Sequence, residues 1–96
     1  MGARKNINYS NEELLIAQIC NAMAHPARAK MILKLLNKGT FRNTDLAKLL
    51  NLSTSTIHNH VYRLKHADLI HLEYAENSYY VTLKPDSIEL LKSMLQ

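Results

Sequence analysis

Small polar residues crowd the start of one predicted helix, and they are of the kinds that hydrogen-bond to nucleic-acid bases. They are Thr54, Ser55, Thr56, His58 and Asn59. Cations follow later in the same helix at Arg63 and Lys65. Base edges need hydrogen-bond donors and acceptors, whereas phosphates need cations. This order of residue types is typical of a helix that lies in the major groove of DNA.

The elements around this segment would hold it in place. Ile57, Val61 and Leu64 recur at i, i+4 and i+7, which predicts a core-facing stripe on a helix from Thr54 to about Ala67. Ser53 is its expected N-cap. A shorter helix over 44–50, capped by Asn43 or Thr44, would precede it, with Asn51 in a left-handed turn between the two. The sequence therefore predicts two helices joined by a tight turn.

A predicted β-hairpin follows these helices. The runs 69–74 and 79–83 are rich in β-prone residues, and the spacer 75–78 has hairpin length. Period-two alternation places Tyr79, Val81 and Leu83 on one face, where they are joined on the buried side by Ile70, Leu72 and Tyr74. A short strand at 40–42 is expected beside the hairpin. Helix, turn, helix and hairpin is the order of a winged helix-turn-helix domain.

Three stretches carry a family resemblance: AMAHPARAKMILKLL at 22–36, DLAKLLNLSTSTIHNHVYRLKHADLI at 45–70, and YYVTL at 79–83. They resemble the ArsR/SmtB family of winged-helix transcriptional repressors, whose pattern runs roughly ALAHPTRLRIL, ELAEALGLSQSTVSHHLKVLREAGLV and YYRL. The resemblance implies a dimeric DNA-binding regulator that reads DNA with the helix of residues 53–65. The sequence departs from the family in having Asp68 where glycine is common, and Glu76, Asn77 and Ser78 where the hairpin tip often has glycine and a cation.

Both predicted terminal helices carry apolar residues on more than one face. Ser10 and Glu13 form a capping box that opens a helix through about Ala24, and Pro85 starts a last helix. Excess apolar surface on a small domain favours a two-fold homodimer interface. The residues expected in it are Leu14, Leu15, Ile19, Cys20, Met23, Ile88, Leu91, Met94 and Leu95. Cys20, the only cysteine, reads as a small core residue, with an intersubunit thiol switch as the alternative.

Charge is distributed unevenly along the 96 residues. The net charge is +4, but residues 69–96 hold two basic and four acidic groups, so the hairpin and C-terminus are poor in cations. Lys30, Lys34 and Lys38 lie on one helical face that is most simply solvated. The residues expected to contact DNA phosphates are Arg28, Arg42, Lys48, Tyr62, Arg63, Lys65 and Asn77.

Chemistry of other kinds is not indicated. Metal-sensing relatives are understood to use cysteine pairs near the third helix or His and acidic pairs on the last one, but residues 41–50 lack Cys and His, and residues 84–96 lack His. His58 and His60 point about 200° apart on a helix, so they cannot share one ion. His60 is expected to be half-packed in the core, and His66 and His71 to lie at the surface. We expect no metal, no cofactor and no enzymatic activity.

The sequence thus predicts a mainly α protein with a β-hairpin wing, dimeric through its terminal helices. Residues 1–9 would form a flexible tail and 10–96 the domain, with dimerisation helices at 10–24 and 86–96, the helix-turn-helix at 44–67 and the wing at 69–83. No membrane span or signal-peptide pattern is found, so a cytoplasmic protein that binds double-stranded DNA is expected. The alternative is a winged helix used as a protein-interaction module, such as an antirepressor, which the acidic hairpin favours.

Overall fold

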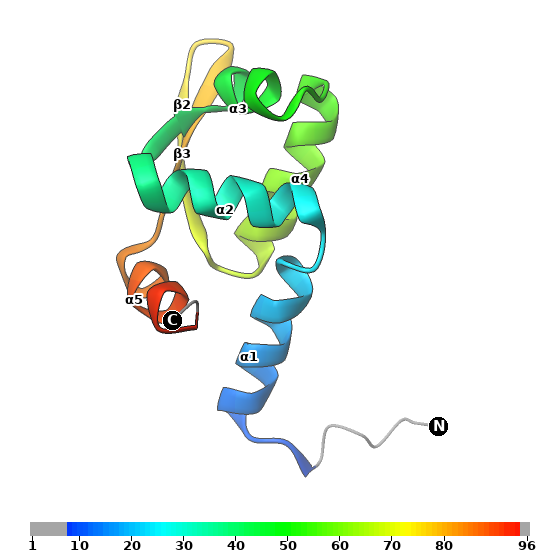
Figure 1. The fold of residues 1–96 in the computed structure, drawn as a ribbon, viewed down its shortest axis with the longest axis vertical. Coiled ribbons are helices and arrows are strands. Elements are labelled where there is room, and N and C mark those ends of the chain that lie inside the picture. The colour runs from blue at the N-terminus through cyan, green and yellow to red at the C-terminus, as the bar shows by residue number, and fades with distance from the viewer. Residues whose placement is uncertain (1–7, 95–96) are drawn as a thin grey trace.

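The computed structural model describes residues 8–94 and has the predicted helix-turn-helix and hairpin at its centre. In chain order its elements are α1 (Asn11–Ala22), α2 (Pro26–Lys38), β1 (Thr40–Arg42), α3 (Asn43–Leu50), α4 (Thr54–His66), β2 (Ile70–Ala75), β3 (Ser78–Leu83) and α5 (Pro85–Met94). Figure 1 shows α2, α3, α4 and the strands forming one body, from which α1 projects. The fold is that of a winged helix-turn-helix domain.

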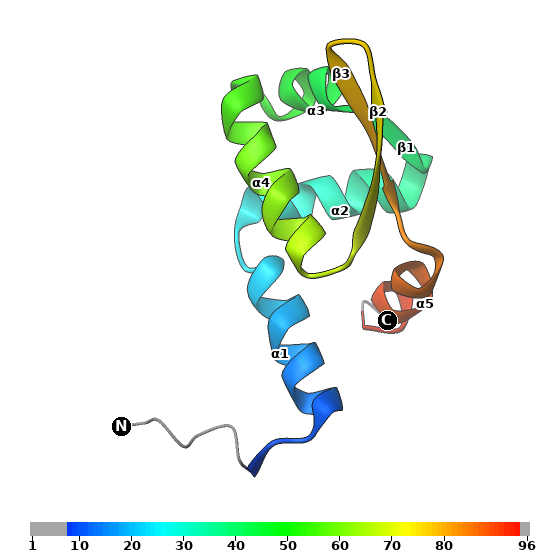
Figure 2. The ribbon, with the colours of Figure 1, turned by 180° about the vertical axis from the view of Figure 1, so that it is seen from behind.

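The three strands form an antiparallel sheet in the order β1-β3-β2. Its register pairs Ile70 with Leu83 and Leu72 with Val81, which puts these four residues on one face, as the alternation predicted. The short strand β1 pairs with β3 through Phe41 and Val81. Tyr74, which we expected on the buried side, is 66% exposed. It pairs with Tyr79, one pair before the end of the hairpin, whose turn Figure 2 shows joining β2 and β3.

The core lies where α2, α3 and α4 meet the sheet. Its most deeply buried side chains include the predicted apolar stripe of α4. The large side chains that are fully buried are Met31, Ile32, Leu35, Leu46, Ile57, Val61, Leu64, Leu69, Ile70, Val81 and Leu91. Each buried aliphatic side chain contributes roughly 1.5–3 kcal/mol relative to exposure. This core fixes α4 against the sheet and leaves its opposite face open.

Most helix ends follow the local signals in the sequence. The capping box of Ser10 and Glu13 is present, Pro26 starts α2, and Gly39 ends it with a φ of +94°. Asn51 adopts the left-handed conformation between α3 and α4, with φ 56° and ψ 47°. Asp68 is also left-handed, with φ 62°, at the position where glycine is common in the family pattern. These turns set the angle at which α4 enters and leaves the core.

The cap of α3 differs from the prediction. Arg42 is the N-cap residue and makes no side-chain cap bond, so neither Asn43 nor Thr44 caps the helix. Asn43 lies in the first turn, and its Oδ1 accepts a hydrogen bond from the backbone N–H of Tyr79 at 3.1 Å. The carboxamide that could have capped α3 instead joins it to β3.

Cys20 also differs from the prediction, because its side chain is exposed and not in the core. Only Ile19 and Ala22 of α1 are buried, so this helix contacts the body along a narrow strip and leaves its other faces to solvent. The core assignment of Cys20 was wrong because a projecting helix does not enclose all of its apolar residues. The two buried positions lie three residues apart, on one side of the helix.

Candidate nucleic-acid interface

The N-terminus of α4 is held by side-chain hydrogen bonds. Oγ of Ser53 accepts from the backbone N–H of Thr56 at 3.1 Å, as predicted for an N-cap, and the Ser53 hydroxyl donates to Oγ1 of Thr56 at 2.9 Å. Thr56 is half-buried, and its own hydroxyl proton remains free to be donated. The cap therefore fixes the first turn, from which base-contacting side chains were predicted to project.

The outer face of α4 is open to solvent along its length. Thr54, Ser55, His58 and Asn59 are all exposed, as are the cations Arg63 and Lys65. Ser55, Asn59 and Arg63 recur at i, i+4 and i+8, so they lie along one side of the helix over roughly 12 Å. Polar groups come first and cations later, so the face can offer hydrogen bonds at one end and positive charge at the other.

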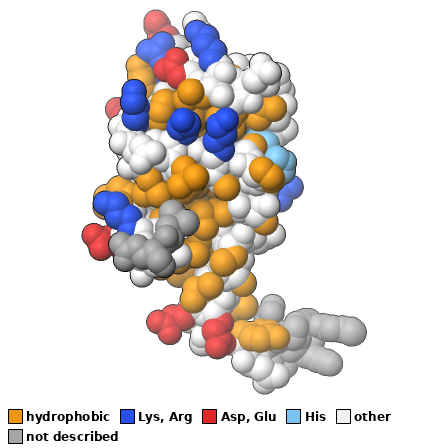
Figure 3. Space-filling model, in the orientation of Figure 1, with side chains coloured by type: hydrophobic (Ala, Val, Ile, Leu, Met, Phe, Trp, Pro, Cys, Tyr) orange, Lys and Arg blue, Asp and Glu red, His pale blue; other side chains and the backbone are white. Residues whose placement is uncertain are grey.

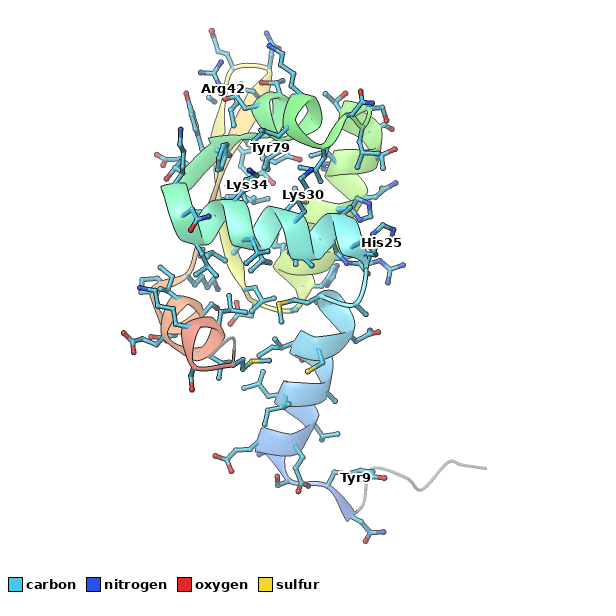
Figure 4. All side chains as sticks on the ribbon, viewed as in Figure 1. Tyr9, His25, Lys30, Lys34, Arg42 and Tyr79 are labelled. Atoms are coloured by element: carbon cyan, nitrogen blue, oxygen red, sulfur yellow. The ribbon has the colours of Figure 1, made fainter. Side chains whose placement is uncertain are left out.

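The hairpin is tied to α4 by a buried tyrosine that sequence reasoning assigned only to packing. Tyr79 is 7% exposed, and its hydroxyl lies 3.3 Å from Nδ1 of His58 (Figure 4 labels Tyr79). Burial, and then the nearby Tyr74, raise the pKa of Tyr79, so its hydroxyl stays neutral. With the bond from its backbone to Asn43, Tyr79 fixes α3, α4 and the hairpin in one arrangement.

Tyr62 forms an aromatic surface on the same helix. Its ring lies 5.7 Å from that of His58 and 5.1 Å from that of His66, measured between centroids. Tyr62 is 49% exposed, so one side of the ring remains open. Such a side chain offers a flat apolar face and a hydroxyl donor, which can pack on a sugar or bond to a phosphate oxygen.

The residues predicted to contact phosphates lie in different surroundings. Lys48, Arg63 and Lys65 are exposed on α3 and α4. Asn77 lies at the hairpin turn with a φ of 60°, a left-handed conformation that asparagine tolerates. These side chains are free to point into solvent, where a DNA backbone would lie.

Two predicted phosphate contacts are engaged within the chain. Nη2 of Arg42 donates to the Tyr80 hydroxyl, and its guanidinium lies 5.1 Å from the centroid of that ring; this hydrogen bond raises the pKa of Arg42. Arg28 is half-buried, and its Nε donates to the carbonyl of Ala22 at the junction of α1 and α2. The structure thus places Arg28 at the junction of α1 and α2, where Arg63, an outer-face cation of α4, lines the same pocket.

The predicted dimer residues divide into exposed and buried sets. On α1, Leu14 is 39% and Leu15 48% exposed, and on α5 Met94 is 40% exposed. Figure 3 shows apolar side chains along the projecting part of the molecule. Ile19 and Leu91 are instead buried within the single chain, Met23 and Ile88 are half-buried, and Leu95 lies outside the described residues.

Within residues 8–94 no group of three or more His, Cys, Asp or Glu side chains is placed to hold a metal ion. None of the helices in that range has the length and apolar character needed to cross a membrane.

Comparison with known proteins identifies the class of this domain. The fold is similar to that of HlyU from Vibrio cholerae, with a TM-score of 0.76 and 22% identity over 90% of this chain and 97% of that one. It is also similar to NolR from Sinorhizobium fredii, with a TM-score of 0.70 and 26% identity over 91% and 90% of the two chains. A third similar structure is that of the transcriptional repressor PagR of Bacillus anthracis. Its TM-score is 0.68 and its identity 21%, over 83% of this chain and 92% of that one. A search of curated proteins gives no match.

The fold and the exposed helix face define a winged helix-turn-helix DNA-binding domain. Residues 25–71 match the model of the bacterial regulatory protein arsR family. Over residues 25–71 the chain belongs to the ArsR family of transcriptional regulators, as the sequence motifs indicated. Its family and structural neighbours are regulators of transcription and not enzymes.

Proposed function

We propose that this protein is a transcriptional repressor that binds an inverted-repeat operator as a homodimer. The observation that carries the proposal is the open face of α4, where Ser55 and Asn59 precede Arg63 on one side of a helix fixed at its start by the Ser53 cap. Base edges are read by such hydrogen-bonding side chains, and the register of the helix on DNA is set by cations on phosphates. Repression follows when the bound protein occupies promoter DNA.

The homodimer is supported by the apolar surface of α1. Leu14, Leu15 and Ile16 are 39%, 48% and 51% exposed, an uncommon density for a helix of a small monomer. A two-fold axis would bury this surface and present two copies of α4. Two linked α4 helices match the symmetry of an inverted repeat. In this proposal Leu14, Leu15, Cys20 and Met94 lie at the interface, and the buried Ile19 and Leu91 support it from the core.

The proposal is tested by selecting preferred sites from random duplexes and then titrating two variants. Asn59→Ala should cost about 1–3 kcal/mol on the preferred site and little on random DNA, because it removes a base contact. Lys65→Ala should weaken binding to both and reduce the salt dependence, because it removes a phosphate contact. Recovery of an enriched inverted repeat, with this split between variants, supports sequence-specific binding.

The second candidate function is a protein-interaction module, and the hairpin favours it. Glu73 and Glu76 are exposed on or beside the hairpin tip, where a wing that grips phosphates would carry cations. If selection enriches no sequence, and the triple change of Ser55, Thr56 and Asn59 to Ala leaves every measured activity intact, the DNA-reading role of α4 is overturned. Transcription from a promoter that carries the selected site separates repression from activation.

A further inference from the structure

A cationic pocket lies behind the outer face of α4, where the end of α1 and the start of α2 meet the second half of α4. Its volume is about 180 Å³, and its polar lining consists of Gln18, Asn21, Arg28, Arg63 and His66. Pockets for drug-sized ligands occupy roughly 300–1,000 Å³, so this one has room only for a small group. No acidic side chain is among the described residues that line it.

The guanidinium of Arg28 is fixed at one side of this pocket. Its Nε donates to the carbonyl of Ala22, and its Nη1 lies 3.5 Å from Nδ1 of His60. Arginine has five N–H donors in a planar fork, so several remain available after these contacts. Within residues 8–94 neither Arg28 nor Arg63 forms an ion pair, although both line the same hollow.

Amide and imidazole groups complete a set rich in donors. Nε2 of Gln18 donates to the carbonyl of His66 at 3.2 Å, which joins α1 to the end of α4 across the pocket. The side chains of Asn21 and His66 are exposed at the same place. Two guanidinium groups with neighbouring N–H donors and no carboxylate are the surroundings that stabilise an oxyanion, because an arginine fork matches two oxygens of one anion.

We propose that this pocket binds a small oxyanion of the phosphate, sulfate or carboxylate type, and that its binding lowers the affinity for DNA. The coupling rests on the proposed function, in which Arg63 contacts a DNA phosphate. Arg63 lines the pocket and also belongs to the outer face of α4. Its guanidinium can therefore bind either the oxyanion in the pocket or a DNA phosphate, but not both at once. An anion that holds Arg63 in the pocket removes a contact to DNA, and by linkage DNA lowers the affinity for the anion equally.

The first experiment uses sulfate and the DNA-free protein. Sulfate replaces chloride at constant ionic strength, and nuclear magnetic resonance follows the side-chain amides of Gln18 and Asn21. The expected result is a saturable shift of both amides. Shifts that stay linear in sulfate, or that chloride reproduces, overturn the site.

Asn21→Asp and Asn37→Asp form a matched pair for this test. Each asparagine is exposed and is the next-to-last residue of its helix, α1 or α2, but only Asn21 lines the pocket. Asn21→Asp should weaken sulfate binding by about tenfold or more, because like charges placed together in a binding site repel strongly. Asn37→Asp should bind sulfate as the unaltered protein does. Equal affinities of the two variants for sulfate overturn the site.

The second experiment measures DNA affinity on the selected site while sulfate replaces chloride at constant ionic strength. Sulfate should weaken DNA binding by the unaltered protein and by Asn37→Asp, and should have no specific effect on Asn21→Asp. Saturable sulfate binding without this effect overturns the coupling. If sulfate does not bind but Asn21→Asp alone weakens DNA binding, a DNA phosphate occupies the pocket and the effector site is overturned. If sulfate saturates the pocket and no DNA is recognised, the proposed function fails and the anion site stands.

Discussion

His60 is a buried polar side chain that connects the middle of α4 to the start of α2. Its ring centroid lies 4.6 Å from that of His25, and its Nδ1 lies 3.5 Å from Nη1 of Arg28. Figure 4 shows His25 at the beginning of α2, where its Nδ1 accepts from the N–H of Ala27 as an N-cap. Burial, and then His25 and Arg28, lower the pKa of His60 below its usual 6.5. The folded chain therefore favours the neutral imidazole.

The first prediction is that His60 makes the protein less stable in mild acid. Between the lowered pKa of the folded state and 6.5, the unfolded chain binds more protons, so the free energy of unfolding rises with pH in that window. The stability that the neutral His60 contributes to the free energy of unfolding is fully present above pH 6.5. It is lost as the pH falls from 6.5 through the lowered pKa of the folded state. Thermal unfolding from about pH 7.5 to 5.5 should show a steeper loss for the unaltered protein than for His60→Gln. If both proteins lose thermal stability equally as the pH falls, His60 is not the cause of the loss.

Tyr79 and Tyr80 stand side by side in β3 and face opposite sides of the sheet. The Tyr79 hydroxyl lies 3.3 Å from Nδ1 of His58 in a partly buried contact, whereas the Tyr80 hydroxyl accepts from Arg42 at the surface. A hydrogen bond of a buried hydroxyl contributes more than one that water can replace.

The second prediction compares Tyr79→Phe with Tyr80→Phe. Tyr79→Phe keeps the buried ring and removes only the bond to His58, so it should cost about 0.5–1.5 kcal/mol of the free energy of unfolding. Tyr80→Phe should cost less, because Arg42 can bond to water instead. Denaturant unfolding measures both. An equal or larger cost for Tyr80→Phe would show that the Tyr79 hydroxyl does not tie the hairpin to α4.

Among the elements, α1 carries three large apolar side chains that the described residues, 8–94, leave exposed. It buries Ile19 and Ala22 and leaves Leu14, Leu15 and Ile16 largely exposed. Exposure of these apolar side chains to water is unfavourable, and another subunit that covered them would remove this cost.

The third prediction is that Leu15→Glu abolishes the proposed dimer. A carboxylate on the apolar face of α1 would be desolvated in the interface, so association should be lost at micromolar concentration. Leu33→Glu is the matched control, because Leu33 is 51% and Leu15 48% exposed but Leu33 lies on α2. Light scattering should report monomers for Leu15→Glu and dimers for Leu33→Glu and the unaltered chain. A monomeric unaltered protein would contradict the interface altogether.

Local signals in the sequence were enough to place most elements. Periodicity located α4 and the hairpin, and Asn51 and Ser53 marked the turn between α3 and α4, because these features depend on residues close together in the sequence. The cap of α3 was not predictable, since Asn43 bonds to Tyr79, a residue 36 positions away. The prediction that Cys20 is buried failed because it also depends on distant residues. Whether a helix projects is decided by how it packs against the rest of the chain.

The two candidate sites differ in how much of each could be predicted from the sequence. The outer face of α4 follows from one helical pattern, so its polar and cationic residues could be identified before the fold was known. The anion pocket joins Gln18 and Asn21 of α1 to Arg28 of α2 and Arg63 of α4. No spacing rule connects residues of three separate helices, and only the packed structure brings them together.

At the scale of the whole molecule, α4 and the projecting α1 lie toward different parts of an elongated domain. The domain measures 44 × 29 × 23 Å, with α1 at one end of the long axis and the hairpin tip at the other (Figures 1 and 2). Pairing through α1 would therefore leave α4 and the hairpin of each subunit uncovered. The two α4 helices would be related by the same two-fold axis that relates the α1 helices.

The last prediction is that DNA affinity depends on how two half-sites are arranged. A two-fold dimer presents its α4 helices in opposite orientations, so the selected site should be an inverted repeat with half-sites about one helical turn apart, or a multiple of it. Reversing one half-site to give a direct repeat keeps every base contact available to a single subunit, yet it should lower affinity to the level of one half-site. Inserting about five base pairs should do the same, because it rotates one half-site to the opposite face of the duplex.

Leu15→Glu supplies the control for these operator changes. A monomer gains nothing from a second half-site, since binding two linked sites is favoured only when the two subunits are joined. Titration of the three duplexes should separate them for the unaltered protein and give one common affinity for Leu15→Glu. If the unaltered protein binds the direct repeat as tightly as the inverted one, each subunit reads DNA alone. The apolar face of α1 would then require a different partner.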